Sequence, residues 1–297
     1  MDNLVSVVIP TYKRYGEILE NAIKSVLEQS YNLIEIIVVD DNIDYSYTKS
    51  IKEMLKKYPS IKYISYEGNK GACFARNEGI IHSNGKFCAF LDDDDEWYTE
   101  KITKQMEKFV NDSIALVYCG INYYYQKDDL NKEIYAEKKI NPVKELLHKN
   151  YIGSTSCGIV RKSSALKVGL FDVNLKSGQD LDFWIRLALE YEIECVKECL
   201  IKYTLYENDS ITSNVKNRLE SNIYLYKKYR KIIEKDSILS STFILKIFKS
   251  YWINNKKTKA FVFFAKSYLN KEITVVSSVK IIKRIKTNKR RTINYAN

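Results

Sequence analysis

Four aspartates stand side by side in this chain, at Asp92, Asp93, Asp94 and Asp95. They directly follow the apolar segment 87–91, which is typical of a buried strand. Carboxylate oxygens are the ligands that hard divalent cations such as Mg²⁺ and Mn²⁺ prefer. A cation at the Asp-x-Asp pair could neutralise charge that develops on a leaving phosphate. A solvated acidic loop ahead of a helix is the structural alternative.

A second pair of carboxylates, Asp40 and Asp41, follows another apolar segment, residues 34–39. In a parallel sheet the carboxyl ends of the strands meet at one edge, and ligands bind beyond that edge. Clustered carboxylates repel one another, so we expect a cationic group to compensate them. For Asp41 the structural alternative is a cap on the helix that follows.

The sequence has few histidines and no paired cysteine motif, which limits the chemistry that these residues could perform. The only histidines are His82 and His148, which nearly excludes a Ser-His-Asp triad or a multi-histidine metal site. Acid–base or metal chemistry must therefore rest on carboxylates. No C-x-x-C pair occurs, and we interpret all the cysteines as buried free thiols of a reducing compartment. They are Cys73, Cys88, Cys119, Cys157, Cys195 and Cys199.

The elements that must position these carboxylates alternate regularly over the first 110 residues. Apolar segments predict strands, and segments with helical spacing of apolar residues predict helices between them. The strands are 5–9, 34–39, 62–66 and 87–91, and the helices are 15–29, 50–58, 72–82 and 98–110. Strands that are apolar on both faces indicate an α/β fold with a mainly parallel sheet flanked by helices. Further on, we expect strands at 114–120 and 157–161 and a helix at 181–191.

Charge divides the chain into two parts. The net charge is +11, yet the part up to residue 213 is acidic and residues 214–297 are strongly basic. We therefore predict a catalytic domain at 1–213 and a basic helical C-terminal region at 214–297. Within it, segment 279–291 places isoleucines on one face of a helix and Lys and Arg opposite them. This pattern favours an anionic membrane surface, or a solvated or docked tail, over nucleic acid.

No apolar run approaches the roughly 20 residues of a membrane span, and no signal peptide is expected because an apolar strand begins almost at Met1. The protein is expected to be cytoplasmic. Peripheral attachment to the inner face of the cell membrane stays open.

Four motifs in this order and spacing resemble glycosyltransferase family 2. They are V-S-V-V-I-P-T-Y at 5–12, I-I-V-V-D-D at 36–41, N-K-G-A-C-F-A-R-N-E-G-I at 69–80 and G-K-F-C-A-F-L-D-D-D-D at 85–95. The resemblance covers residues 5–213. It implies a Rossmann-like GT-A fold and an inverting enzyme with a nucleotide-sugar donor, of the type that builds bacterial cell-surface polysaccharides.

The resemblance assigns residues to the donor nucleotide. It implies that Pro10 and Tyr12 border the base and that Asp41 accepts a hydrogen bond from it, which favours uracil and hence UDP. It places Arg76 near the nucleotide or its phosphates. Ordinary packing is the structural alternative for Tyr12.

The resemblance also implies roles for three residues of the acidic run. Asp92 is implied to lie near the ribose and the metal, and Asp94 to ligate the metal, which is Mn²⁺ or Mg²⁺. Asp93 belongs with the residues that surround the nucleotide sugar, although that position is usually small in the family.

On the acceptor side, the stretch G-Q-D-L-D-F-W-I-R at 178–186 is similar to a family segment that usually carries Glu-Asp, the Asp being the catalytic base. Here the pair is Gln179-Asp180, so Asp180 is the implied base. An inverting displacement needs one base to take the acceptor proton. The structural alternative is that Asp180 and Asp182 merely begin an amphipathic helix.

The expected activity is transfer of a sugar from a nucleotide-diphosphate sugar to a hydroxyl of a saccharide or lipid-linked acceptor in cell-surface glycan biosynthesis. The neutral Gln179 keeps one alternative open, a catalytically silent nucleotide-sugar-binding protein of the same fold. A nucleic-acid-binding protein has only the basic tail in its favour.

Overall fold

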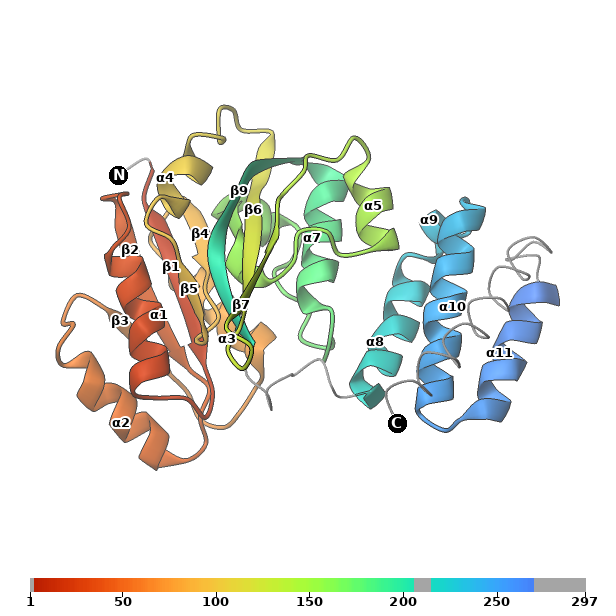
Figure 1. Ribbon diagram of the computed structural model, residues 1–297, viewed down its shortest axis with the longest axis horizontal. Coiled ribbons are helices and arrows are strands. Elements are labelled where there is room, and N and C mark those ends of the chain that lie inside the picture. Colours follow the sequence, from red (N-terminus) through yellow and green to blue (C-terminus); the bar gives the residue numbers. More distant parts are fainter. Residues whose placement is uncertain (1–2, 206–214, 270–297) are drawn as a thin grey trace. The chain divides into compact units, whose positions relative to one another are not determined.

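The computed structural model describes residues 3–205 and 215–269 (Figure 1). These residues form two compact units, which are described separately. The first unit comprises residues 3–146, 150–174 and 179–205, and the second comprises 147–149, 175–178 and 215–269.

A parallel half-sheet begins the first unit. Its strands are β1 (Val5–Thr11), β2 (Ile34–Asp40), β3 (Lys62–Ser65) and β4 (Phe87–Phe90), in the spatial order β3-β2-β1-β4. Every residue of β1 and β4 is buried, as expected for strands that helices cover on both faces. The connecting helices are α1 (Glu17–Leu27), α2 (Tyr45–Leu55) and α3 (Ala72–Ile81). The expected mainly parallel sheet flanked by helices is confirmed.

The sheet continues beyond β4 with mixed directions. The order runs β4-β8-β6-β9-β5, and β7 pairs with β6. The bounds are β5 (Asp95–Trp97), β6 (Ile114–Tyr125), β7 (Leu130–Ile134), β8 (Gly158–Arg161) and β9 (Glu192–Leu205). Strand β8 is antiparallel to both β4 and β6, whereas β6 and β9 are parallel. The remaining elements are α4 (Lys101–Met106), α5 (Pro142–His148), the 3₁₀ turn η1 (Thr155–Cys157), α6 (Lys162–Lys167) and α7 (Gln179–Glu190).

Two helices differ more than the others from their expected bounds. The helix expected at 50–58 begins at Tyr45, because the Asp44 carboxylate accepts a hydrogen bond from the backbone N–H of Ser46 and caps it. The helix expected at 98–110 is shorter and follows a strand, β5, that the pattern did not indicate. Asp95 pairs with Tyr203 of β9 in that strand and is buried. The last aspartate of the acidic run is therefore not part of a solvated loop.

The second unit is helical in its described part. Its helices are α8 (Val215–Lys228), α9 (Arg230–Ile233), α10 (Ser237–Ile253) and α11 (Lys257–Leu269). Helix α10 packs against α8 and α11 and buries Phe243, Ile247 and Phe248. Within residues 3–205 and 215–269, no helix combines the length and apolar character that a membrane-spanning segment requires. The basic segment 279–291 lies outside the described residues.

The cysteines follow the expectation. All six are free thiols; five are buried, and Cys199 is half-buried.

Candidate active site

The carboxyl ends of three parallel strands bring the predicted residues to one edge of the sheet. Thr11 ends β1, Asp40 ends β2 and Asp92 follows β4. The backbone N–H of Asp41 donates to the carbonyl of Thr11 at 3.0 Å, which ties two of these ends together. The topology therefore gathers side chains that are far apart in the sequence.

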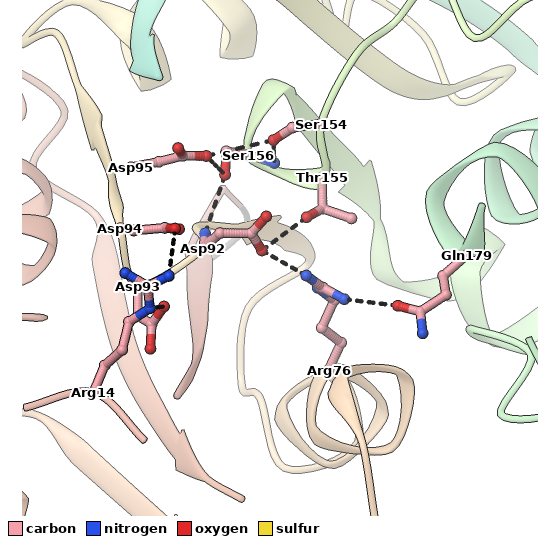
Figure 2. A network of polar contacts seen from close by, with 10 residues as sticks. All are labelled: Arg14, Arg76, Asp92, Asp93, Asp94, Asp95, Ser154, Thr155, Ser156 and Gln179. Carbon is pink, nitrogen blue, oxygen red and sulfur yellow. Dashed lines mark hydrogen bonds and ion pairs between the residues drawn. The ribbon is translucent and has the colours of Figure 1, made fainter. Parts of the chain in front are cut away.

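Asp92 lies at the centre of a polar network (Figure 2). Arg76 donates through Nη2 to Asp92 Oδ1 at 2.5 Å, and Thr155 Oγ1 donates to the same oxygen at 3.0 Å. The other terminal nitrogen of Arg76, Nη1, donates to Gln179 Oε1 at 3.5 Å. Arg76 comes from α3 and is buried, so its charge is held between the acidic run and the start of α7.

Asp93 points into the protein. Its carboxyl is buried, 3.3 Å from Arg14 Nε, and its Oδ2 has no hydrogen-bond partner among the described residues. Burial and the neighbouring Asp94 charge raise the pKa of Asp93 to about 7, against the opposing effects of a hydrogen bond with the Thr11 side chain and of the Arg14 charge. This carboxyl is therefore hard to ionise, first because it is buried and second because its neighbours are negatively charged.

Asp94 is the more exposed neighbour and pairs with Arg14 Nη2 at 2.9 Å. Arg14 is held by an unusual backbone turn after β1. Lys13 adopts φ 55°, rare for a residue other than glycine, and its N–H donates to Asn42 Oδ1 at 2.6 Å. Sequence reasoning expected a compensating cation but did not identify Arg14, whose only signal was its place two residues after the Pro-Thr-Tyr motif.

Asp95 is part of the scaffold. Ser156 Oγ donates to Asp95 Oδ2 at 2.5 Å, and Ser154 Oγ donates to the same atom at 3.5 Å. Burial, followed by the charges of Asp92 and Asp94, raises the pKa of Asp95 well above its usual range. The same Ser156 Oγ accepts from the backbone N–H of Asp92 at 3.0 Å, so the η1 turn fixes the acidic run at both ends.

Asp41 is fully occupied within the protein. Its two carboxylate oxygens accept from Tyr66 Oη, Asn69 Nδ2 and the backbone N–H groups of Lys70 and Gly71, at 2.7–2.9 Å. Four bonds fill the acceptor capacity of a carboxylate. Asp41 therefore anchors the loop that precedes α3, and contact with a base requires one of these bonds to be exchanged.

The two residues implied to border the base differ in exposure. Pro10 is buried within β1, opposite Val39 of β2. Tyr12 follows the strand and is 41% exposed, with Lys13 Nζ 5.2 Å from its ring centre. Tyr12 is thus not a packed core residue, and its ring is accessible for stacking.

Asp180 lies in the first turn of α7 and is partly buried. Asn150 Nδ2 donates to its Oδ2 at 2.6 Å. Burial raises the pKa of Asp180, while the Leu181 backbone N–H, Arg76 and Asn150 oppose that rise. Arg76 therefore acts electrostatically on both Asp92 and Asp180.

Asp182 has a different environment. It is fully buried and pairs with Arg186 Nε at 2.8 Å. Arg186 also donates to the backbone carbonyls of Val168 and Leu170. The structural alternative thus accounts for Asp182, which holds α7 against the preceding loop.

A metal ion at this edge would have to be held by Asp92 and Asp94. Among the described residues, no group of three or more His, Cys, Asp or Glu side chains is arranged to hold a metal ion. Mg²⁺ in phosphate-transfer sites is commonly held by one or two carboxylates together with substrate phosphates. Burial is the main cause of the raised pKa of Asp93, and the charges of Asp94 and Asp92 add to it; a cation would relieve this added repulsion, so the donor set fits.

Curated relatives include glycosyltransferases of surface glycans. The chain is 30% identical over 236 residues to the putative teichuronic acid biosynthesis glycosyltransferase TuaG of Bacillus subtilis, with 77% of this chain and 89% of the relative covered. It is 31% identical over 242 residues to the GalNAc(5)-diNAcBac-PP-undecaprenol beta-1,3-glucosyltransferase of Campylobacter jejuni, with 80% and 76% covered.

Solved structures share the fold at low identity. S. aureus TarS in complex with UDP-GlcNAc superposes with a TM-score of 0.57 and 14% identity, covering 90% of this chain and 92% of that chain. The mannosyltransferase PcManGT from Pyrobaculum calidifontis, in complex with GDP-Man and Mn²⁺, gives a TM-score of 0.58 and 13% identity, covering 95% and 79%. These matches confirm the GT-A fold.

The family model described as "Glycosyl transferase family 2" matches residues 6–172, more than half of the chain. This stretch contains Asp41, Arg76 and the whole acidic run. By this match and by the curated relatives, the chain belongs to glycosyl transferase family 2.

Proposed function

We propose that this glycosyltransferase moves a sugar from a UDP-sugar to an acceptor hydroxyl with inversion at the anomeric carbon. One observation carries the proposal. Arg76 joins the acidic run to the start of α7, so that Asp92, Gln179 and the neighbouring Asp180 lie around a single buried cation. The groups suited to a donor diphosphate and the group suited to accept a proton are thereby adjacent.

The donor lies along the carboxyl edge of β1, β2 and β4. The base contacts Tyr12 and Pro10, and Asp41 exchanges one of its internal bonds for the base. Arg76 and Arg14 supply positive charge near the phosphates. Asp92 and Asp94 would hold Mn²⁺ or Mg²⁺, and the bound ion would supply Lewis-acid neutralisation of negative charge on the diphosphate. Asp93, between them in the sequence, is the buried carboxyl among the residues that surround the nucleotide sugar.

Transfer is a single displacement. The acceptor oxygen attacks the anomeric carbon while the bond from that carbon to the diphosphate oxygen breaks. Asp180 takes the acceptor proton as the new bond forms, and the electron pair leaves with the UDP. The partly buried position of Asp180 supports this role, because burial raises its pKa and makes it a better proton acceptor.

The acceptor is a saccharide or lipid-linked hydroxyl in cell-surface glycan biosynthesis. The names of the two curated relatives support this, one by teichuronic acid and the other by an undecaprenol-linked glycan. Such acceptors are consistent with a cytoplasmic enzyme at the inner face of the membrane, reached through the basic segment 279–291.

A thermal-shift panel of nucleotide sugars with Mn²⁺ tests the donor. The cognate donor at a hundredfold its dissociation constant adds about 2.7 kcal/mol to the free energy of unfolding. We expect a UDP-sugar to raise Tm with Mn²⁺ and to do so much less in EDTA. A shift with GDP-mannose but no UDP-sugar would overturn the uridine assignment. Release of UDP on adding an acceptor would separate an enzyme from a silent binding protein.

A further inference from the structure

The segment 150–156, which runs from the loop after α5 into η1, contacts both halves of the candidate site. At its start Asn150 bonds to Asp180, and at its end Ser156 bonds to Asp95 and to the backbone of Asp92. Thr155 between them bonds to the Asp92 carboxylate. A single short segment therefore holds the carboxylates on the donor side and the carboxylate on the acceptor side.

The side chain of Asn150 has one consistent orientation. Its Oδ1 accepts from the backbone N–H groups of Ile152 and Gly153 at 3.2 and 3.3 Å. Its Nδ2 donates to the carbonyl of Gly153 at 2.8 Å and to Asp180 at 2.6 Å. Rotating the amide would place an oxygen against the Asp180 carboxylate and a nitrogen against two N–H donors. Asn150 therefore faces Asp180 as a donor.

The backbone that carries Asn150 is closely packed at Gly153. Gly153 adopts φ +97°, a conformation that residues with a side chain rarely adopt. A Cβ at this position would lie 2.5 Å from Ile121 Cδ1 of β6. The loop is thus closely packed against the sheet, and the half-buried Asn150 amide is held by four hydrogen bonds.

We propose that Asn150 is a positioning residue for the transfer, whose side-chain amide fixes the Asp180 carboxylate relative to the donor-binding edge and favours its charged form. This inference rests on the proposed role of Asp180 as the base. The charged groups that act on Asp180 are Arg76 of α3, which favours the carboxylate, and Asp92 after β4, which disfavours it. Asn150 is the neutral donor in this set.

Carboxyl ¹³C NMR of the full-length chain, labelled at aspartate, measures the effect without knowledge of the substrate. The signal that is missing in Asp180→Asn identifies Asp180. Asn150→Asp is the sharpest variant, because it keeps the acceptor for the two backbone N–H groups and replaces the donor by a like charge. We expect it to raise the titration midpoint of Asp180 by about one to two pH units, and Asn150→Ala to raise it less.

Asn77→Ala is the matched control, because Asn77 also anchors a loop, through two hydrogen bonds to the Phe171 backbone, without bonding to Asp180. Its Asp180 midpoint should stay at the wild-type value. An unchanged midpoint in Asn150→Asp, or an equal rise in Asn77→Ala, would overturn the inference. Neither result bears on whether Asp180 is the base, which is decided by the loss of transfer in Asp180→Asn.

Discussion

The acidic run after β4 and the aspartate pair at the start of α7 use the same residue type in opposite ways. In the run, four adjacent carboxyls are compensated by the charges of two arginines, Arg14 and Arg76, and accept hydrogen bonds from hydroxyl groups of the η1 turn. In α7, Asp180 faces the neutral Asn150, whereas Asp182 forms a buried ion pair with Arg186. The run concentrates negative charge, and α7 separates its two charges.

This difference suits two kinds of chemistry. Crowded carboxylates attract a cation, because each additional negative charge raises the cost of ionising the others. An isolated, partly buried carboxylate with neutral and cationic neighbours can accept a proton and return it. The comparison is tested by altering one region while the other is monitored.

The largest effect is expected from Asp94→Ala. Loss of this carboxylate should abolish both the requirement of donor binding for a divalent ion and the transfer activity, because Asp94 is one of only two carboxylates proposed to hold the ion and is half-buried rather than fully buried. Calorimetry of UDP binding with Mn²⁺ and in EDTA measures the first effect. Full wild-type activity in EDTA would remove the metal assignment.

The next largest effect is expected from Asp180→Asn. Transfer should fall by about 10²–10⁴-fold, typical of a lost general base, while UDP and Mn²⁺ bind as in the wild type. A coupled UDP-release assay together with calorimetry checks both statements. Near-normal transfer would mean that the base is another residue.

Asp182→Asn is the control for that experiment, and its expected defect is in stability. Removing one partner of a buried ion pair typically costs about 3–5 kcal/mol, because Arg186 is left without its carboxylate. Below its unfolding transition, the variant should lose much less transfer than Asp180→Asn. A larger loss of transfer would place the base at Asp182.

A smaller effect on stability is expected for Asp93→Asn in the absence of metal, and it is a gain rather than a loss. The folded pKa of Asp93 is about 7, above its ordinary 3.8, so the folded protein holds this proton more tightly than the unfolded chain. Wild-type stability should therefore fall as pH rises from about 4 to 7. Denaturant unfolding in EDTA should show Asp93→Asn more stable than wild type at pH 8, with a smaller difference at pH 5. Equal stability at pH 8 would contradict the raised pKa.

The smallest effect on the site is expected from removal of residues 279–297. Turnover on a soluble acceptor should stay intact, because every residue assigned to the site lies before this segment. Sedimentation with vesicles that contain anionic lipid should weaken, since the segment carries clustered Lys and Arg. Identical sedimentation of truncated and full-length proteins would exclude a membrane role for the segment.

Alternating apolar and amphipathic segments were sufficient to predict the parallel half of the sheet, because burial on both faces leaves a continuous apolar run. Strand β9 was not predicted, since Glu192, Glu194 and Lys197 interrupt its apolar residues and its pairing with β6 is long-range. The short β5 was not predicted either, because its partner strand, β9, lies in a distant part of the sequence.

The sequence by itself determined the family, the carboxylates and the edge of the sheet to which they belong, because these follow from local motifs and from the direction of parallel strands. Tertiary structure alone decided which aspartates differ in character. Asp93, Asp95 and Asp182 became buried, and Asp180 acquired Asn150. The physical reason is that the charge state and orientation of a carboxylate depend on its neighbours in space. Most of those neighbours lie far away in the sequence.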